Sequence, residues 1–187
     1  AMLLRHEAVV RVMDYGVYEG SPFLVMEYIP GPSLLRQMNS GHRFSVEQVL
    51  NILRQLAEAL NAFHERKLVH RDLKPANVLM SAQGEPKLCD FGLSKSVGGA
   101  DASLTQTGMA FGSPAYMAPE AIKGERVGLS ADVWSFGVMV CELVGGRLPF
   151  AGRVAGEVWA SALRDEPTLS SLPEWLRGPV AQCLTKE

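Results

Sequence analysis

Residues 45–65 carry the sequence pattern that most constrains the fold. Apolar residues recur there three and four positions apart, at Val46, Val49, Leu50, Leu53, Leu56, Ala57, Leu60 and Phe63. This spacing places them along one face of an α-helix. Ser45, followed three residues later by Gln48, predicts a capping box at the start of that helix. A helix with one apolar face must pack against another element, so a globular core is expected around it.

A second helix is predicted over residues 131–144, where apolar residues occupy ten of the 14 positions. The apolar stretch 133–144 is too short to span a bilayer and contains Glu142, so it is typical of a buried core helix. The composition agrees with a globular domain, because 47% of the 187 residues are hydrophobic and 20% are charged.

Shorter elements surround these two helices. Residues 9–18 and 23–28 are predicted to form a hairpin around a turn at 19–22. Ser33 is expected to cap a short helix that runs to Met38. Two more short strands are predicted at 78–80 and 86–89. Residues 92–112 are small and polar without a period, which is typical of a functional or mobile loop.

The charge and the cysteines narrow the class of protein. A net charge of −2 gives no indication of a nucleic-acid or membrane-surface partner. Cys89, Cys141 and Cys183 have neither metal-site spacing nor an even disulfide framework, which favours a reduced chain. No secretory signal pattern opens the sequence. We therefore expect a cytoplasmic location, although a segment outside this chain could anchor the parent protein to a membrane.

Three short clusters carry the chemistry. They are His-Arg-Asp-Leu-Lys-Pro-Ala-Asn at 70–77, Asp-Phe-Gly at 90–92 and Ala-Pro-Glu at 118–120. Each tripeptide alone is a weak signal, and an isolated Asp72 or Lys74 is most often a turn residue or a surface charge. Their order, with Lys and Asn at fixed offsets after the first cluster, resembles the signature set of protein kinases.

This resemblance extends over the whole chain and implies an α+β, protein-kinase-like fold. It implies a mostly helical large lobe at 29–187 and a remnant hairpin of the small lobe at 1–28. Kinases of this family begin with a Gly-rich loop and a strand Lys paired to a helix Glu, and these are missing here. The chain also stops before the Arg that normally pairs with the Glu of the third cluster. We therefore expect a fragment that is unstable and a poor kinase by itself.

The catalytic assignments follow the resemblance and the chemistry of phosphoryl transfer, which depends on positioning and charge neutralisation. Asp72 is expected to orient the substrate hydroxyl and accept its proton. Lys74 is expected to place a cation on the transferring phosphate. Asn77 and Asp90 offer the hard oxygen ligands that suit Mg²⁺ bound to ATP.

Adenine binding is predicted for the segment that follows the second strand. The resemblance implies that the carbonyl of Glu27 and the N–H of Ile29 contact the base, with Met26 behind it and Leu79 beneath it. The alternative is that this segment is simply an apolar core strand.

Several features favour serine/threonine specificity and regulation by phosphorylation. Lys74 stands where serine/threonine kinases carry Lys, and residues 112–120 resemble their substrate-docking loop, with Ser113 at the usual threonine position. Thr105 and Thr107 resemble the autophosphorylated threonines of the eukaryotic-like kinases of bacteria, with Ser103 a weaker third. Arg71 and Lys95 are the cations expected to bind the added phosphate group through charge-assisted hydrogen bonds.

Other residues have expected packing roles. The resemblance implies structural positions for His70, Phe91, Glu120 and Asp132. Cys89 is expected to be a packed thiol, although a thiol facing the ATP cleft would be open to electrophiles.

The leading hypothesis is an ATP- and Mg²⁺-dependent protein serine/threonine kinase. Its partners would be protein substrates, with self-association for trans-autophosphorylation. A pseudokinase or docking module is the second hypothesis, which the intact catalytic loop disfavours. A small-molecule phosphotransferase is the third, and the docking loop and the third cluster argue against it.

Overall fold

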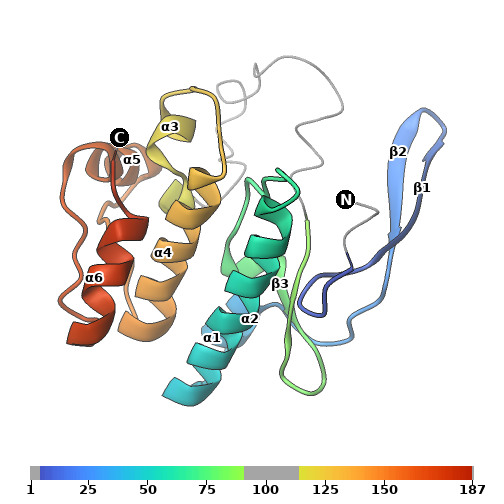
Figure 1. The fold of residues 1–187 in the computed structure, drawn as a ribbon, viewed down its shortest axis with the longest axis horizontal. Helices are drawn as coiled ribbons and strands as arrows, with labels where there is room; N and C mark the ends of the chain where they lie inside the picture. The colour runs from blue at the N-terminus through green and yellow to red at the C-terminus, as the bar shows by residue number, and fades with distance from the viewer. Residues whose placement is uncertain (1–4, 91–113, 187) are drawn as a thin grey trace. The chain divides into compact units, whose positions relative to one another are not determined.

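The computed structural model describes residues 5–90 and 114–186 (Figure 1). The chain divides into two compact units. The first unit takes the described residues up to Leu68 and those from Pro75 to Asp90. The second takes Val69–Lys74 and the described residues from Pro114 onward. The described elements are helices and two antiparallel hairpins. Each unit is described by itself below.

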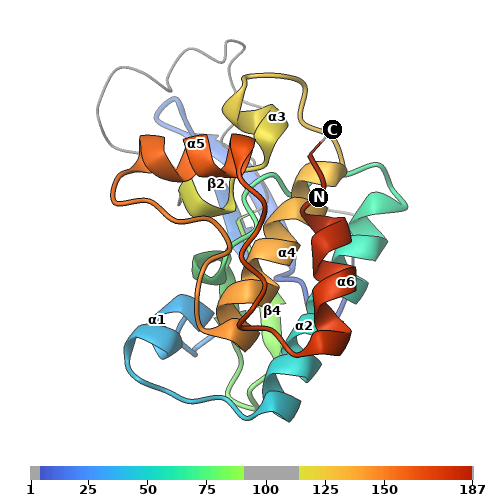
Figure 2. The ribbon, with the colours of Figure 1, turned by 90° about the vertical axis from the view of Figure 1, so that its left-hand side faces the viewer.

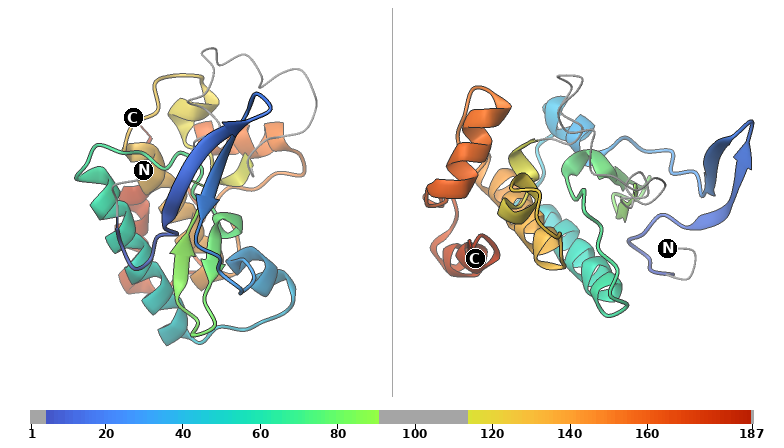
Figure 3. Two further views of the ribbon diagram at one scale, coloured as in Figure 1. Left: turned by 90° about the vertical axis from the view of Figure 1, so that its right-hand side faces the viewer. Right: turned by 90° about the horizontal axis from the view of Figure 1, so that it is seen from above.

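The first hairpin pairs β1 (Val12–Tyr18) with β2 (Ser21–Met26), which confirms the predicted hairpin (Figure 3). The predicted four-residue turn is too long, because only Glu19 and Gly20 lie between the strands. Both have positive φ angles, 50° and 79°. Two left-handed residues in a two-residue loop match the right-handed twist of the strands, so the ladder continues almost to the turn.

This hairpin is poorly covered. Every residue of β2 is exposed, and the sheet holds only two strands among the described residues. Large apolar side chains such as Val17 and Phe23 are 71% and 45% exposed. A two-stranded hairpin with open faces gains little from apolar burial and is marginal in water. Its edges also present backbone groups that can pair with another strand.

Helix α2 (Val46–His64) matches the prediction closely. Ser45 is its N-cap, and both arms of the capping box with Gln48 are formed. Five of the eight predicted face residues are buried, with Leu56 fully inaccessible and Phe63 only 3% exposed. Val46, Leu50 and Ala57 are exposed instead, because they lie at the margin of the buried face. This face packs against the second hairpin through β4 (Pro86–Leu88).

The second hairpin, β3 (Val78–Met80) with β4, lies at the centre of the first unit. On one side the chain at Val9 bridges Leu88 in parallel fashion. On the other side Ser33 bridges Leu79, and Ser33 also caps α1 (Leu34–Asn39) by accepting a hydrogen bond from the Arg36 N–H. The predicted strands and the short helix are thus confirmed.

Gly31 is required by this packing. A Cβ atom at position 31 would lie 1.7 Å from the backbone oxygen of Met80. Only glycine permits that approach, which brings the segment after β2 directly against β3.

The second unit is built around α4 (Ser130–Gly145), the buried helix predicted from composition (Figure 2). Helix α6 (Glu174–Cys183), α3 (Pro119–Ile122) and the 3-10 turn η3 (Pro114–Tyr116) all pack against it. Helix α5 (Ala155–Arg164) covers η3 and α3. Within the part of the chain that the structure describes, no helix is both long and apolar enough to cross a membrane.

Gly137 of α4 faces the end of α6. A Cβ added there would lie 2.8 Å from the Cβ of Cys183 and 3.1 Å from the side chain of Leu184. The Cβ of Cys183 cannot move away without its backbone, so this contact depends on glycine.

We predict that Gly137→Ala lowers the free energy of unfolding by about 1–3 kcal/mol, because the added methyl group overpacks the α4–α6 contact. Gly156→Ala is the matched control, since a Cβ at position 156 of α5 meets no atom within 4 Å. This control is expected to leave stability unchanged or raise it by up to about 1 kcal/mol. Urea unfolding of the purified proteins measures both, and equal effects at the two sites would contradict the prediction.

Candidate functional site

The Asp132 carboxylate anchors the loop that carries the first sequence cluster. Its Oδ2 accepts a hydrogen bond from the His70 N–H, and its Oδ1 accepts one from the Arg71 N–H, both at 2.8 Å. His70 is fully buried and Asp132 is 1% exposed. Asp132 lies in the first turn of α4, where a negative charge is favoured by the helix dipole. The loop is therefore fixed to the central helix of the second unit.

Arg71 has a left-handed backbone, with φ of 69°. For a residue with a Cβ this conformation costs roughly 1–2 kcal/mol. The charge-assisted bond from its N–H to Asp132 offsets that cost. The arginine side chain itself remains exposed.

Asp72 and Lys74, the predicted base and phosphate-binding cation, form an ion pair. The Lys74 Nζ lies 2.7 Å from the Asp72 Oδ2. The Lys74 side chain is 15% exposed and that of Asp72 is 42% exposed, so the pair sits at the surface end of the anchored loop. His70 reaches the same residue, because its Nδ1 accepts a hydrogen bond from the Asp72 N–H at 3.3 Å. The structure thus brings together the carboxylate and the cation that the sequence singled out.

Asn77 and Asp90 are brought together within the first unit. The Asn77 carbonyl accepts hydrogen bonds from the Cys89 N–H at 2.9 Å and from the Cys89 thiol at 3.3 Å. Asp90 directly follows Cys89, so Asp90 lies beside Asn77 at the same end of the β3–β4 hairpin. Asn77 is 6% exposed, whereas Asp90 is exposed and has a left-handed φ of 57°.

These two residues fit a magnesium ion by the chemistry of their oxygens. A carboxylate and an amide oxygen are hard ligands, and protein-bound Mg²⁺ often takes only one or two protein ligands beside phosphates and water. Among the described residues no group of three or more His, Cys, Asp or Glu side chains converges on one point.

Cys89 is a packed thiol, as expected from the sequence. It is 6% exposed. Burial, followed by the charge of Asp90, raises the pKa of Cys89 to about 12. Because the thiolate is the reactive species, this cysteine is protected from electrophiles at neutral pH.

Glu27 is tied to the start of β1. The Arg11 N–H donates to its Oε1 at 2.8 Å, and the Glu27 N–H donates to the Arg11 carbonyl at 2.9 Å. Of the other predicted adenine contacts, Met26 is 38% exposed and Leu79 is half-buried at the bridge to Ser33. Ile29 is also half-buried.

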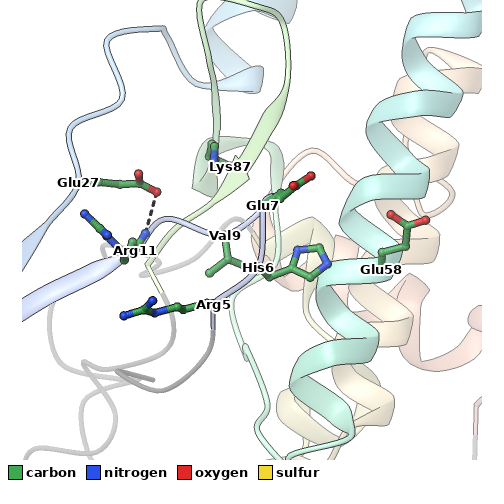
Figure 4. Close-up of a pocket in the computed structure, with 8 residues that line it drawn as sticks. All are labelled: Arg5, His6, Glu7, Val9, Arg11, Glu27, Glu58 and Lys87. Atoms are coloured by element: carbon green, nitrogen blue, oxygen red, sulfur yellow. Dashed lines mark hydrogen bonds between the residues drawn. The ribbon is translucent and has the colours of Figure 1, made fainter.

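An open pocket of about 680 Å³ lies on the Arg11 side of Glu27 (Figure 4). Its walls carry three basic and three acidic side chains together with a histidine and a valine: Arg5, Arg11, Lys87, Glu7, Glu27, Glu58, His6 and Val9. Such balanced charge selects no single class of ligand. Met26, Ile29 and Leu79 are not among the lining residues.

The described end of the predicted docking loop is bound to α4 through Tyr116. This tyrosine is 8% exposed, and its hydroxyl donates to the Glu142 Oε2. Its carbonyl accepts a hydrogen bond from the Ser135 Oγ at 2.8 Å. Burial raises the pKa of Glu142, an effect that the Tyr116 hydroxyl partly offsets. Burial and then the bond to Glu142 raise the pKa of Tyr116, so the hydroxyl keeps its proton and remains a donor.

Glu120, the predicted structural carboxylate of the third cluster, is half-buried at the start of α3. Its Oε1 accepts a hydrogen bond from the Ser130 Oγ at 3.1 Å, which links α3 to the first residue of α4.

Five predicted residues lie outside the described part of the chain: Phe91, Lys95, Thr105, Thr107 and Ser113. Conversely, Ser135 and Tyr116 were not predicted as functional. The sequence did contain one signal for the contact of Tyr116 with α4, namely Glu142, the single acidic residue between Val133 and Val144.

Comparison with known proteins decides the family. The model of the protein kinase domain family matches residues 1–185. The chain belongs to the protein kinase family. This confirms the predicted fold class, a helical large lobe with a remnant small-lobe hairpin.

Curated relatives are bacterial serine/threonine-protein kinases, which confirms the predicted branch of the family. A probable serine/threonine-protein kinase, pknA2 of Bifidobacterium longum, is 39% identical over 76% of this chain and 18% of its own length. Serine/threonine-protein kinase pkn2 of Myxococcus xanthus is 41% identical over 80% of this chain and 18% of its own. Serine/threonine-protein kinase PknA of Mycobacterium tuberculosis is 38% identical over 88% of this chain and 39% of its own length. The chain thus spans well under half the length of these relatives.

Proposed function

We propose that the protein containing this chain transfers the γ-phosphate of ATP to serine and threonine hydroxyls of other proteins. The observation that carries the proposal is the loop at 70–74, which is held by Asp132 and presents the Asp72–Lys74 ion pair. Membership of the kinase family and the names of the relatives support the same reaction class.

Asp72 is the proposed catalytic base. Its side chain is 42% exposed, so a substrate hydroxyl can approach it. Lys74 orients this carboxylate by pairing with one of its oxygens, and the same ammonium can neutralise charge on the phosphoryl group in flight. The position of both residues follows from the rigid backbone at His70 and Arg71.

Asn77 and Asp90 are the proposed magnesium ligands. When bound there, Mg²⁺ would neutralise the phosphates of ATP during transfer. Cys89 supports this pair, because its two hydrogen bonds to the Asn77 carbonyl hold the end of the β3–β4 hairpin together. Met26, Glu27, Ile29 and Leu79 remain the proposed contacts to adenine.

A non-catalytic docking module is the second candidate. The exposed β1–β2 hairpin favours it, since apolar side chains on an open sheet suit a binding surface. The intact set of Asp72, Lys74, Asn77 and Asp90 favours catalysis instead, because a module that only binds needs none of these four. That the 187-residue chain is inactive by itself stays a prediction.

We predict that Asp72→Asn in the full-length protein lowers kcat by about 10²–10⁴-fold, because the amide cannot accept the hydroxyl proton. ATP binding should remain nearly unchanged. Asp165→Asn, which alters an exposed aspartate after α5, is the control and should retain full activity. Phosphate transfer to a protein acceptor and ATP titration measure the two effects. A kcat above roughly a tenth of wild type would exclude Asp72 as the base.

We further propose that phosphorylation of Thr105 and Thr107 activates the enzyme through Arg71 and Lys95. Arg71 has the geometry to support this role, since its backbone is fixed and its side chain is exposed. Phosphate adds about −1.5 to −2 charges and pairs well with such cations. Autophosphorylation could occur between two copies of the protein.

The expected result is phosphate on at least one of the two threonines when the full-length kinase is incubated with ATP and Mg²⁺ and mapped by mass spectrometry. The double variant Thr105→Ala, Thr107→Ala should lose activity, and adding Arg71→Ala should cause little further loss. Full activity in the double variant would argue against the switch.

A further inference from the structure

Arg11 and Glu27 close the β1–β2 hairpin at its open end, and their pairing is irregular. Val12 faces Met26 in the ladder. Arg11 and Glu27 are therefore the next facing pair along the two chains. The Glu27 N–H donates to the Arg11 carbonyl at 2.9 Å, as in a regular antiparallel pair. The Arg11 N–H, however, donates to the side-chain Oε1 of Glu27 at 2.8 Å, which is the dashed line in Figure 4.

This arrangement leaves the backbone carbonyl of Glu27 outside the ladder. In a hydrogen-bonded antiparallel pair the two residues exchange both N–H···O=C bonds, so the Arg11 N–H would normally occupy that carbonyl. The carboxylate of the same residue takes its place. Among residues 5–90 and 114–186, no backbone N–H donates to the Glu27 carbonyl. This carbonyl therefore keeps its capacity to accept a hydrogen bond from a ligand.

The segment that follows Glu27 is short and is fixed at its far end. The Pro32 carbonyl accepts a hydrogen bond from the Met80 N–H at 3.0 Å, which ties the segment to β3. The proline at position 30 favours an extended conformation at Ile29. The Glu27 carboxylate fixes the near end of the same segment. It therefore acts on a stretch of chain that has few ways to move.

We propose that the Glu27 carboxylate is a positioning residue for ATP, because by accepting the Arg11 N–H it keeps the Glu27 carbonyl available to the amino group at C6 of adenine. The ligand class is a purine nucleotide with a hydrogen-bond donor at C6. Guanine carries an acceptor oxygen there and would be disfavoured. This inference rests on the proposed kinase function and on the proposed contact between this carbonyl and the base.

The test measures the binding of two nucleotides to the full-length protein by calorimetry in the presence of Mg²⁺. ATP carries the C6 amino group, and purine riboside 5′-triphosphate lacks it. In Glu27→Ala the carboxylate is gone, so the Arg11 N–H is expected to bond to the carbonyl at position 27. The Kd for ATP should rise about fivefold to tenfold, as expected for the loss of one neutral hydrogen bond. The Kd for purine riboside triphosphate should stay within about twofold of the wild-type value.

Phosphate transfer to myelin basic protein supplies a second readout. The KM for ATP should rise in Glu27→Ala, whereas kcat should stay within about twofold. The reason is that the loop that carries Asp72 is anchored separately, through the two hydrogen bonds to Asp132.

Three further variants separate positioning from general stability. Glu27→Gln retains an oxygen that can accept from the Arg11 N–H, so both Kd values should stay within about threefold of wild type. Glu27→Met keeps a side chain of similar length without an oxygen. It should reproduce the alanine result, and it tests the proposal if the alanine variant does not fold. Glu7→Ala removes an exposed carboxylate from the same pocket and should change neither Kd.

Three outcomes in an active wild type would overturn the positioning role alone. One is an unchanged Kd for ATP in Glu27→Ala and Glu27→Met. Another is an equal loss of affinity for the two nucleotides, which would indicate a purely structural bond. The third is equal wild-type affinity for ATP and purine riboside triphosphate, because the carbonyl would then make no contact with the amino group. A wild-type protein that binds no ATP would overturn the proposed function and this inference together.

Discussion

The second unit depends on one buried carboxylate. Asp132 is 1% exposed and accepts the backbone N–H groups of both His70 and Arg71. A buried charge is stable only when its oxygens are hydrogen-bonded, and two backbone donors meet that need here. The bond from the Arg71 N–H also offsets part of the cost of the left-handed conformation of Arg71. The hydrogen bonds to Asp132 therefore stabilise the fold and also fix the backbone that carries Asp72.

Helix α4 has a further role, because it presents Asp132 near one end and Glu142 near the other. The first residue binds the loop that carries the proposed base, and the second binds Tyr116 of the 3-10 turn η3. Both attachments are made through hydrogen bonds to carboxyl groups, which are more directional than apolar contacts. Nine residues of α4 are buried, and close packing around them keeps the two attachment points at a fixed separation.

The sequence predicted the elements whose signals are local. The capping box at Ser45 and Gln48 marked the start of α2 to the residue, because side chain and backbone satisfy each other within one turn. The hairpin turn was predicted to cover residues 19–22, which is too long, because Ser21 and Pro22 pair within the ladder as the first residues of β2. The hydrogen bond from Tyr116 to Glu142 could not be predicted, because it joins residues 26 positions apart and depends on how η3 packs on α4. The roles of Asp72, Lys74, Asn77 and Asp90 came from the resemblance, and their geometry agrees with those roles without testing them.

Hydrogen–deuterium exchange at His70 and Arg71 tests most directly whether Asp132 organises the proposed catalytic loop. In the wild type both amides should be protected. In Asp132→Asn only one oxygen remains to accept, so at least one amide should exchange about tenfold faster or more. Exchange at Leu88, whose N–H is bonded to the Ala8 carbonyl in the other unit, should be unchanged. Equal protection of His70 and Arg71 in the variant and the wild type would contradict the account.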